Sequence, residues 1–120
     1  MMKPISVWKQ ELSGGAHAAR LAALYCCAPE QTPAQAARYE AVLDGLEATF
    51  GPHAEAGLYS APGRTEIGGN HTDHQHGRVL AGSVNIDMIA AAGPNTLGQL
   101  RVQSEGYDLC VIDLNDLAAR

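Results

Sequence analysis

The polar residues best suited to ligand chemistry gather in one stretch, residues 61–77, which reads Ala-Pro-Gly-Arg-Thr-Glu-Ile-Gly-Gly-Asn-His-Thr-Asp-His-Gln-His-Gly. Its glycines permit tight backbone bends and let a ligand approach the main chain closely. Arg64 supplies a fixed cation. Asp73 and Glu66 supply acceptors when ionised, and Asn70 both donates and accepts hydrogen bonds. Because a sugar hydroxyl also donates and accepts, this set of side chains suits a polyol.

The same stretch resembles the first signature of the galactokinases, which belong to the group of small-molecule kinases that includes the homoserine and mevalonate kinases. That signature runs Gly-Arg-x-Asn-x-Ile-Gly-Glu-His-x-Asp-Tyr, followed by Gly-x-Val-Leu. The chain keeps in register Gly63, Arg64, Gly69, His71, Asp73, Gly77, Val79 and Leu80. It departs from the signature with Glu66 for Asn, Gly68 for Ile, Asn70 for Glu and His74 for Tyr.

The resemblance implies a role for four of these residues. Arg64 is expected to lie beside the reacting hydroxyl and phosphate, where a fixed guanidinium stabilises developing charge. Asp73 is expected to accept hydrogen bonds from sugar hydroxyls, with an Asx turn as its structural alternative. Asn70 stands where a sugar-binding carboxylate is usual, which leaves the identity of the sugar open. His71 matches the signature histidine and either binds substrate or holds the loop.

A zinc site is the alternative interpretation of the histidines, since His71, Asp73, His74 and His76 have suitable ligand chemistry. Their order differs from the His-x-His-x-Asp-His motif of the metallo-β-lactamases, and we assign no metal ligand. Nor does the chain contain Gly-x-x-x-x-Gly-Lys-Ser/Thr or Gly-x-Gly-x-x-Gly. The resemblance implies instead that ATP and Mg²⁺ bind mainly at a Gly- and Ser-rich loop, and that this loop and a catalytic aspartate lie beyond Arg120.

Composition narrows the class of protein. The 120 residues suffice for one small core, and the net charge of −5 comes with no basic stripe for nucleic acid or a membrane surface. The N-terminus has no long apolar run, so we expect neither a signal peptide nor a transmembrane helix, and a cytoplasmic protein. An odd cysteine count with Cys26 beside Cys27 predicts buried free thiols rather than a disulfide framework.

The apolar pattern predicts helices in residues 1–53 and strands in residues 54–120. The best-marked helix begins at Thr32, which is expected to cap it together with Gln35, and ends at Gly51. Alternation then predicts strands at Leu58–Ile67, Val79–Ala81, Val84–Ala90, Leu97–Gln103 and Leu109–Leu114, with a hairpin turn at Glu105–Gly106 between the last two. The expected class is α+β with a mixed or mostly antiparallel sheet, and the resemblance makes it the N-terminal portion of a two-domain small-molecule kinase fold. Without the remainder of that fold, the strands from Gly57 onward are expected to leave an unpaired edge and an uncovered face.

Taken together, the sequence predicts part of a sugar kinase. The parent enzyme would transfer the γ-phosphate of ATP to the anomeric 1-hydroxyl of α-D-galactose, giving galactose 1-phosphate. The 120 residues alone are expected to be inactive. The alternatives are a non-catalytic galactose-binding or regulatory relative, and a kinase for a related sugar such as N-acetylgalactosamine.

Overall fold

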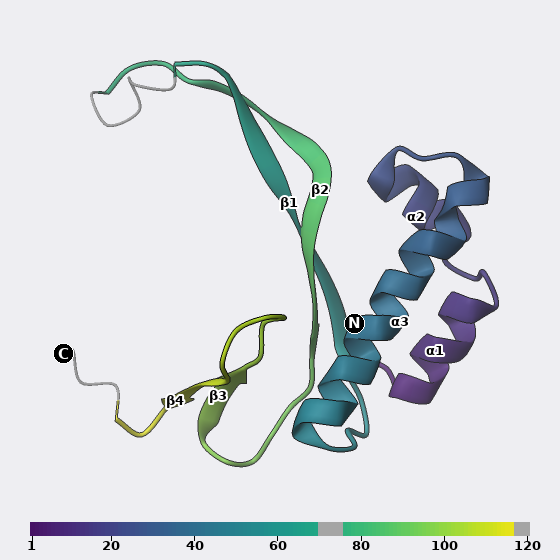
Figure 1. Cartoon of the computed structure of the whole chain (residues 1–120), viewed down its shortest axis with the longest axis vertical. Helices are drawn as coiled ribbons and strands as arrows, with labels where there is room; N and C mark the ends of the chain where they lie inside the picture. Colours follow the sequence, from purple (N-terminus) through teal and green to yellow (C-terminus); the bar gives the residue numbers. More distant parts are fainter. Residues whose placement is uncertain (70–75, 117–120) are drawn as a thin grey trace.

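The protein has helices first and antiparallel strands after them, which confirms the predicted α+β class. The computed structural model describes residues 1–69 and 76–116. The helical part contains α1 (Ile5–Ser13), α2 (Ala18–Tyr25), the short 3₁₀ helix η1 (Pro29–Gln31) and α3 (Thr32–Phe50). The strands are β1 (Gly57–Gly68), β2 (Leu80–Ala92), β3 (Gln99–Val102) and β4 (Cys110–Asp113), arranged as Figure 1 shows.

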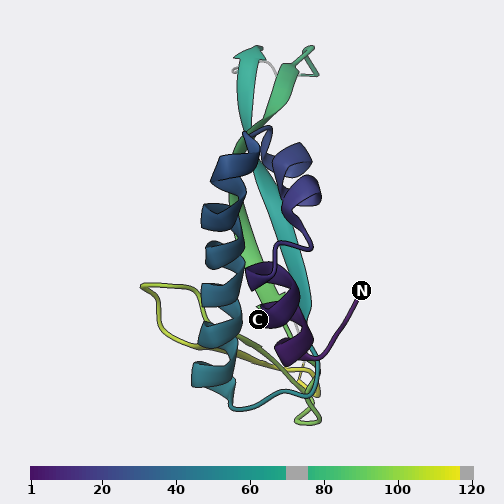
Figure 2. The same cartoon turned by 90° about the vertical axis from the view of Figure 1, so that its right-hand side faces the viewer.

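The core lies between the helices and one face of the β1–β2 hairpin. Figure 2 shows α3 lying lengthwise against the hairpin, with α1 and α2 beside it. The buried core residues are Ile5, Leu12, Leu21, Tyr25, Ala36, Tyr39, Leu43, Leu46 and Ala56. Leu58, Ile89 and Ala91 of the hairpin pack against this cluster. Burial of these apolar side chains therefore fixes the hairpin to the helices.

The N-terminal segment is tied to the start of the hairpin by hydrogen bonds. Lys3 and Ala56 exchange two backbone hydrogen bonds, of 3.0 and 2.8 Å. The indole N–H of Trp8 in α1 donates to the Ala56 carbonyl at 2.8 Å. Ala56 is fully buried, so these bonds satisfy backbone groups that have no access to water.

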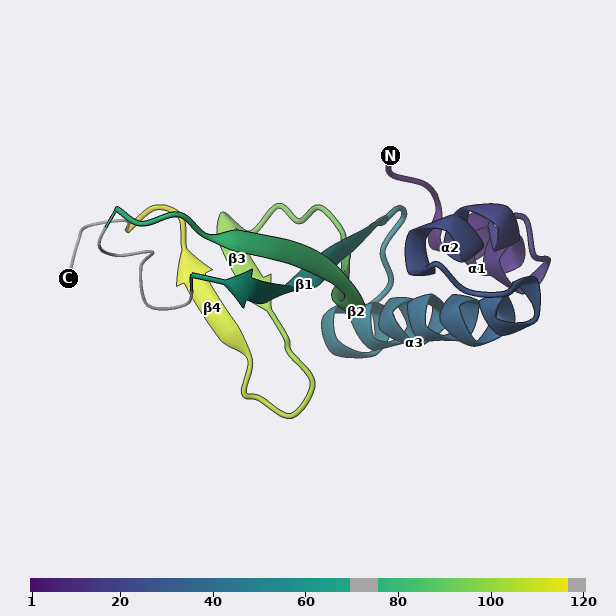
Figure 3. The same ribbon diagram turned by 90° about the horizontal axis from the view of Figure 1, so that it is seen from above.

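Two separate antiparallel pairs make up the strand-rich part. β1 pairs with β2 from Gly57↔Ala92 to Gly68↔Leu80, with irregular register between Pro62 and Arg64 and between Glu66 and Gly68. β3 pairs with β4, as the predicted turn at Glu105–Gly106 requires. Figure 3 shows that α1 and α2 lie to one side of the hairpin. β3 reaches the end of α3, where the Arg101 guanidinium lies 5.1 Å from the centre of the Phe50 ring.

Several local details differ from expectation. The segments predicted as two strands, Val79–Ala81 and Val84–Ala90, form the single strand β2, because β1 is long enough to pair along its whole length. Thr32 does not cap α3: its hydroxyl donates to the Pro29 carbonyl at 2.8 Å, and Gln31 precedes the helix. Cys26 and Cys110 are exposed free thiols rather than buried ones. Among the described residues, no helix is both long and apolar enough to cross a membrane.

Candidate functional site

The β1–β2 hairpin carries the segment in which the sequence places the site. Arg64 lies on β1, is exposed, and faces Ser83 of β2 in the register of the pair. Asn70, His71 and Asp73, the three predicted substrate-binding residues, lie outside the described residues. The roles expected for these three residues therefore rest on the sequence alone, whereas β1, the strand that precedes them, is described.

Residues with left-handed backbone conformations border the segment 70–75 on both sides. Gly69 has φ +95° and His76 has φ +59°. A Cβ atom on Gly69 would overlap the carbonyl oxygen of Arg78 and lie 3.0 Å from the Cα atom of Val79. Glycine is therefore required at position 69 by both conformation and space. This explains one of the glycines on which the resemblance depends.

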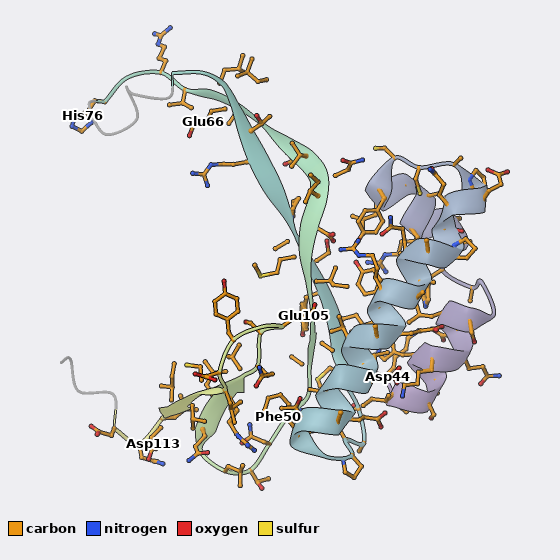
Figure 4. All side chains as sticks on the ribbon, viewed as in Figure 1. Asp44, Phe50, Glu66, His76, Glu105 and Asp113 are labelled. Carbon is orange, nitrogen blue, oxygen red and sulfur yellow. The ribbon has the colours of Figure 1, made fainter. Side chains whose placement is uncertain are left out.

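Glu66 lies three residues before Gly69, toward the end of the hairpin that is farther from the helices (Figure 4). Its side chain is half-buried. Its Oε2 atom is buried and has no hydrogen-bond partner within the part of the chain that the structure describes. Buried carboxylate oxygens normally accept hydrogen bonds, so this atom needs an explanation.

A second polar centre surrounds Asp87, at the interface between the helices and the hairpin. Tyr25 of α2 and Ser60 of β1 both donate hydroxyl hydrogen bonds to Oδ2 of Asp87, each at 2.6 Å. Arg38 of α3 donates to Oδ1 at 2.8 Å. Because the Tyr25 hydrogen points to Asp87, the Tyr39 hydroxyl, 2.8 Å away, is the donor to the Tyr25 oxygen. The Asp87 side chain is only 3% exposed, and these donors satisfy it.

The electrostatics of this cluster favour an ionised Asp87 and a neutral Tyr25. Burial acts to raise the pKa of Asp87, but hydrogen bonds from Ser60, Tyr25 and Arg38 outweigh it and lower that pKa below the usual 3.8. Burial and then the hydrogen bonds with Asp87 and Tyr39 raise the pKa of Tyr25 well above its usual range. This hydrogen-bonded cluster of Tyr25, Arg38, Tyr39, Ser60 and Asp87, called the latch below, therefore joins the helical half of the chain to the hairpin through a charged carboxylate.

We expect this latch to make stability depend on pH on the acid side. Because folding lowers the pKa of Asp87, its contribution is present above the unfolded value of 3.8 and is lost as the pH falls through the folded value. The urea midpoint of unfolding should fall as the pH is lowered below about 4. The same fall should be smaller in Asp87→Asn, which has no carboxylate to protonate at this position. Identical pH profiles for the two proteins would contradict this assignment.

A cavity of about 270 Å³ adjoins the latch, between the C-terminal end of α2 and the middle of the hairpin. Its lining is Leu24, Tyr25, Cys26, Ser60, Pro62, Ser83, Val84, Asn85 and Asp87. Arg64 lies across the strand pair from one of these residues, Ser83. Polar residues of the hairpin therefore extend from Asp87 through Ser83 to Arg64, in the direction of the predicted site.

Sequence reasoning missed the latch. Tyr25 and Tyr39 are buried and also form hydrogen bonds, and the basic side chain that pairs with Asp87 is that of Arg38. The available signal was Asp87 itself, a charged residue within the otherwise uncharged strand Leu80–Ala92.

No group of three or more His, Cys, Asp or Glu side chains within residues 1–69 and 76–116 is arranged to hold a metal ion. Of the residues considered for zinc, His76 is described, and it is exposed at the tip of the hairpin (Figure 4). His71, Asp73 and His74 lie outside the described residues.

The part of the chain that contains the hairpin matches a known protein family. Residues 46–94 match the family described as the galactokinase galactose-binding signature. The chain carries a galactokinase signature. The galactokinase match takes in the last turn of α3, both strands of the hairpin and the segment between them, and so includes Arg64, Glu66, Gly69 and Asp87. No curated protein and no solved structure matched the chain.

The galactokinase match supports the resemblance inferred from the sequence, and it covers residues 46–94 of the 120. It does not extend to α1, α2 or the β3–β4 pair. The latch therefore joins a residue within the signature, Asp87, to two residues outside it, Tyr25 and Arg38.

Proposed function

We propose that this chain is the sugar-positioning part of a galactokinase, which transfers the γ-phosphate of ATP to the 1-hydroxyl of α-D-galactose. The observation that carries the proposal is the match of residues 46–94 to a galactose-binding signature. The retained Arg64, His71 and Asp73 support it further.

In this proposal the chain's own residues bind and orient the sugar. The Asp73 carboxylate accepts hydrogen bonds from sugar hydroxyls, and Asn70 and His71 bond neighbouring hydroxyls. Charge-assisted hydrogen bonds of this kind favour a sugar that has every hydroxyl in place, because a missing hydroxyl leaves the acceptor unpaired. Arg64 provides a cation beside the hydroxyl that reacts, where negative charge develops during transfer.

ATP with Mg²⁺ supplies the phosphoryl group. The bond from the γ-phosphorus to the bridging oxygen breaks, a bond to the sugar O1 forms, ADP leaves, and the hydroxyl proton passes to a base. Such a reaction asks the protein mainly for positioning and electrostatic stabilisation. We propose a cytoplasmic setting, where ATP and free sugar are both available.

A galactose titration by calorimetry tests the proposal. We expect the wild-type chain to bind galactose and Asp73→Ala to bind it at least about tenfold more weakly, since a hydrogen bond to a charged group contributes about 1.5–3 kcal/mol. The matched control is Asp108→Ala, an exposed aspartate between β3 and β4, which should bind as the wild type does. Absence of galactose binding by the wild-type chain would contradict the proposal.

Kinase activity separates this proposal from a non-catalytic galactose-binding relative. In the presence of ATP and Mg²⁺, the complete enzyme should form galactose 1-phosphate, whereas a binding relative should bind galactose and release it unchanged. Comparison of galactose with N-acetylgalactosamine in the same assay decides between the two sugars.

A further inference from the structure

Glu66 has a buried carboxylate oxygen that the fold does not satisfy. Oε2 has no hydrogen-bond partner in the described part of the chain, although it is shielded from water. Leaving a buried polar atom unpaired is costly, and more so for a charged group. The cost is removed if a ligand supplies a hydrogen-bond donor to this oxygen.

The position of Glu66 fits a ligand contact. It lies two residues after Arg64 on β1, so alternation along the strand puts both side chains on the same face. Its cross-strand neighbour is Ala81, whose methyl group offers no donor and leaves space. Three residues further on, Gly69, which has a left-handed backbone conformation, directly precedes the segment that contains Asn70 and Asp73.

The residue types at positions 66 and 70 are exchanged relative to the signature. The chain has Glu66 where the signature has Asn, and it has Asn70 where the signature has Glu. The chain therefore keeps one carboxylate and one amide in this segment, in the opposite order. A single substitution to Asn70 would remove a carboxylate from the site, whereas the pair of changes preserves the count of acceptors and donors.

We propose that Glu66 is a sugar-binding residue, and that its carboxylate accepts a hydrogen bond from a hydroxyl of a neutral sugar in place of the carboxylate absent at Asn70. The inference rests on the proposed function, because it assigns a further residue to the same site. An ionised carboxylate here also disfavours sugars that carry a carboxylate or phosphate of their own, since like charges repel.

Glu66→Gln keeps the size of the side chain and removes its charge, which makes it the test. We expect galactose to bind about tenfold more weakly to Glu66→Gln than to the wild type. Glu105→Gln is the matched control, because Glu105 is exposed on the turn between β3 and β4, away from the hairpin tip (Figure 4), and should bind galactose normally. Circular dichroism confirms that each variant is folded.

A series of monodeoxygalactoses identifies the contact. One member should bind the wild type more weakly than galactose does and should bind Glu66→Gln with no further loss, because the removed hydroxyl and the removed charge belong to one hydrogen bond. The double variant Glu66→Asn with Asn70→Glu should recover more affinity than Glu66→Asn alone. Wild-type binding with Glu66→Gln unaffected would overturn this inference and leave the proposed function intact; no binding by the wild type would overturn both.

Discussion

Replacing Asp87 with alanine is expected to lower the free energy of unfolding by about 3 kcal/mol. The substitution removes the acceptor of hydroxyl hydrogen bonds from Tyr25 and Ser60 and of the guanidinium bond from Arg38. Most of the loss should come from the two hydroxyl bonds, because Arg38 is 41% exposed and can return to water. Urea unfolding followed by the fluorescence of Trp8 and by circular dichroism measures the change.

Asp44→Ala is the matched control for this loss. Asp44 also binds a basic side chain, Lys9, at 2.7 Å, but its side chain is 68% exposed and carries no buried hydrogen bond. Its replacement should leave the urea midpoint unchanged within error. Equal stability of Asp87→Ala and Asp44→Ala would show that the latch contributes nothing to the attachment of the hairpin to the helices.

Replacing Gly69 with alanine is expected to cost about 1–3 kcal/mol of local strain and to weaken galactose binding more than it lowers overall stability. Alanine is disfavoured at φ +95°, and its methyl group would overlap the Arg78 carbonyl, a backbone atom that cannot rotate away. The backbone must then shift at the point where β1 leads into the segment of Asn70 and Asp73. Galactose titration and urea unfolding of the same variant measure the two effects.

The neighbouring glycine provides the control for Gly69. A Cβ atom at Gly68 meets nothing within 4 Å, and its φ is not in the left-handed region. Gly68→Ala should therefore bind galactose with nearly wild-type affinity. If both alanines are tolerated equally, the hairpin tip does not require the left-handed conformation at position 69.

Some features of the candidate site could be predicted from the sequence, and others could not. Arg64 and Gly69 could be placed on a strand and in a turn because residue types and spacing determine such local conformations. The unpaired oxygen of Glu66 could not be predicted, since the sequence shows a changed residue type but not that one of its oxygens is buried without a partner among the described residues. Burial depends on which other segments surround the residue.

The latch is a second feature that could not be predicted from the sequence. Its members come from positions 25, 38, 39, 60 and 87, on two helices and two strands, and each alone is an ordinary tyrosine, serine, arginine or aspartate. Nothing in their spacing predicts that they meet. Packing α3 against the hairpin brings them together and so converts an isolated Asp87 into a satisfied buried charge.

The sequence by itself determined the order of helices and strands, the bounds of α3, the hairpin turn between β3 and β4, and the galactokinase signature with its glycine turn, because these depend on periodicity and on residues close together in the chain. Only the tertiary structure decided that β2 is one continuous strand, that Asp87 holds the hairpin to the helices, and that Glu66 has an unpaired oxygen. The physical reason is that strand pairing, burial and ionisation are set by contacts between residues far apart in sequence.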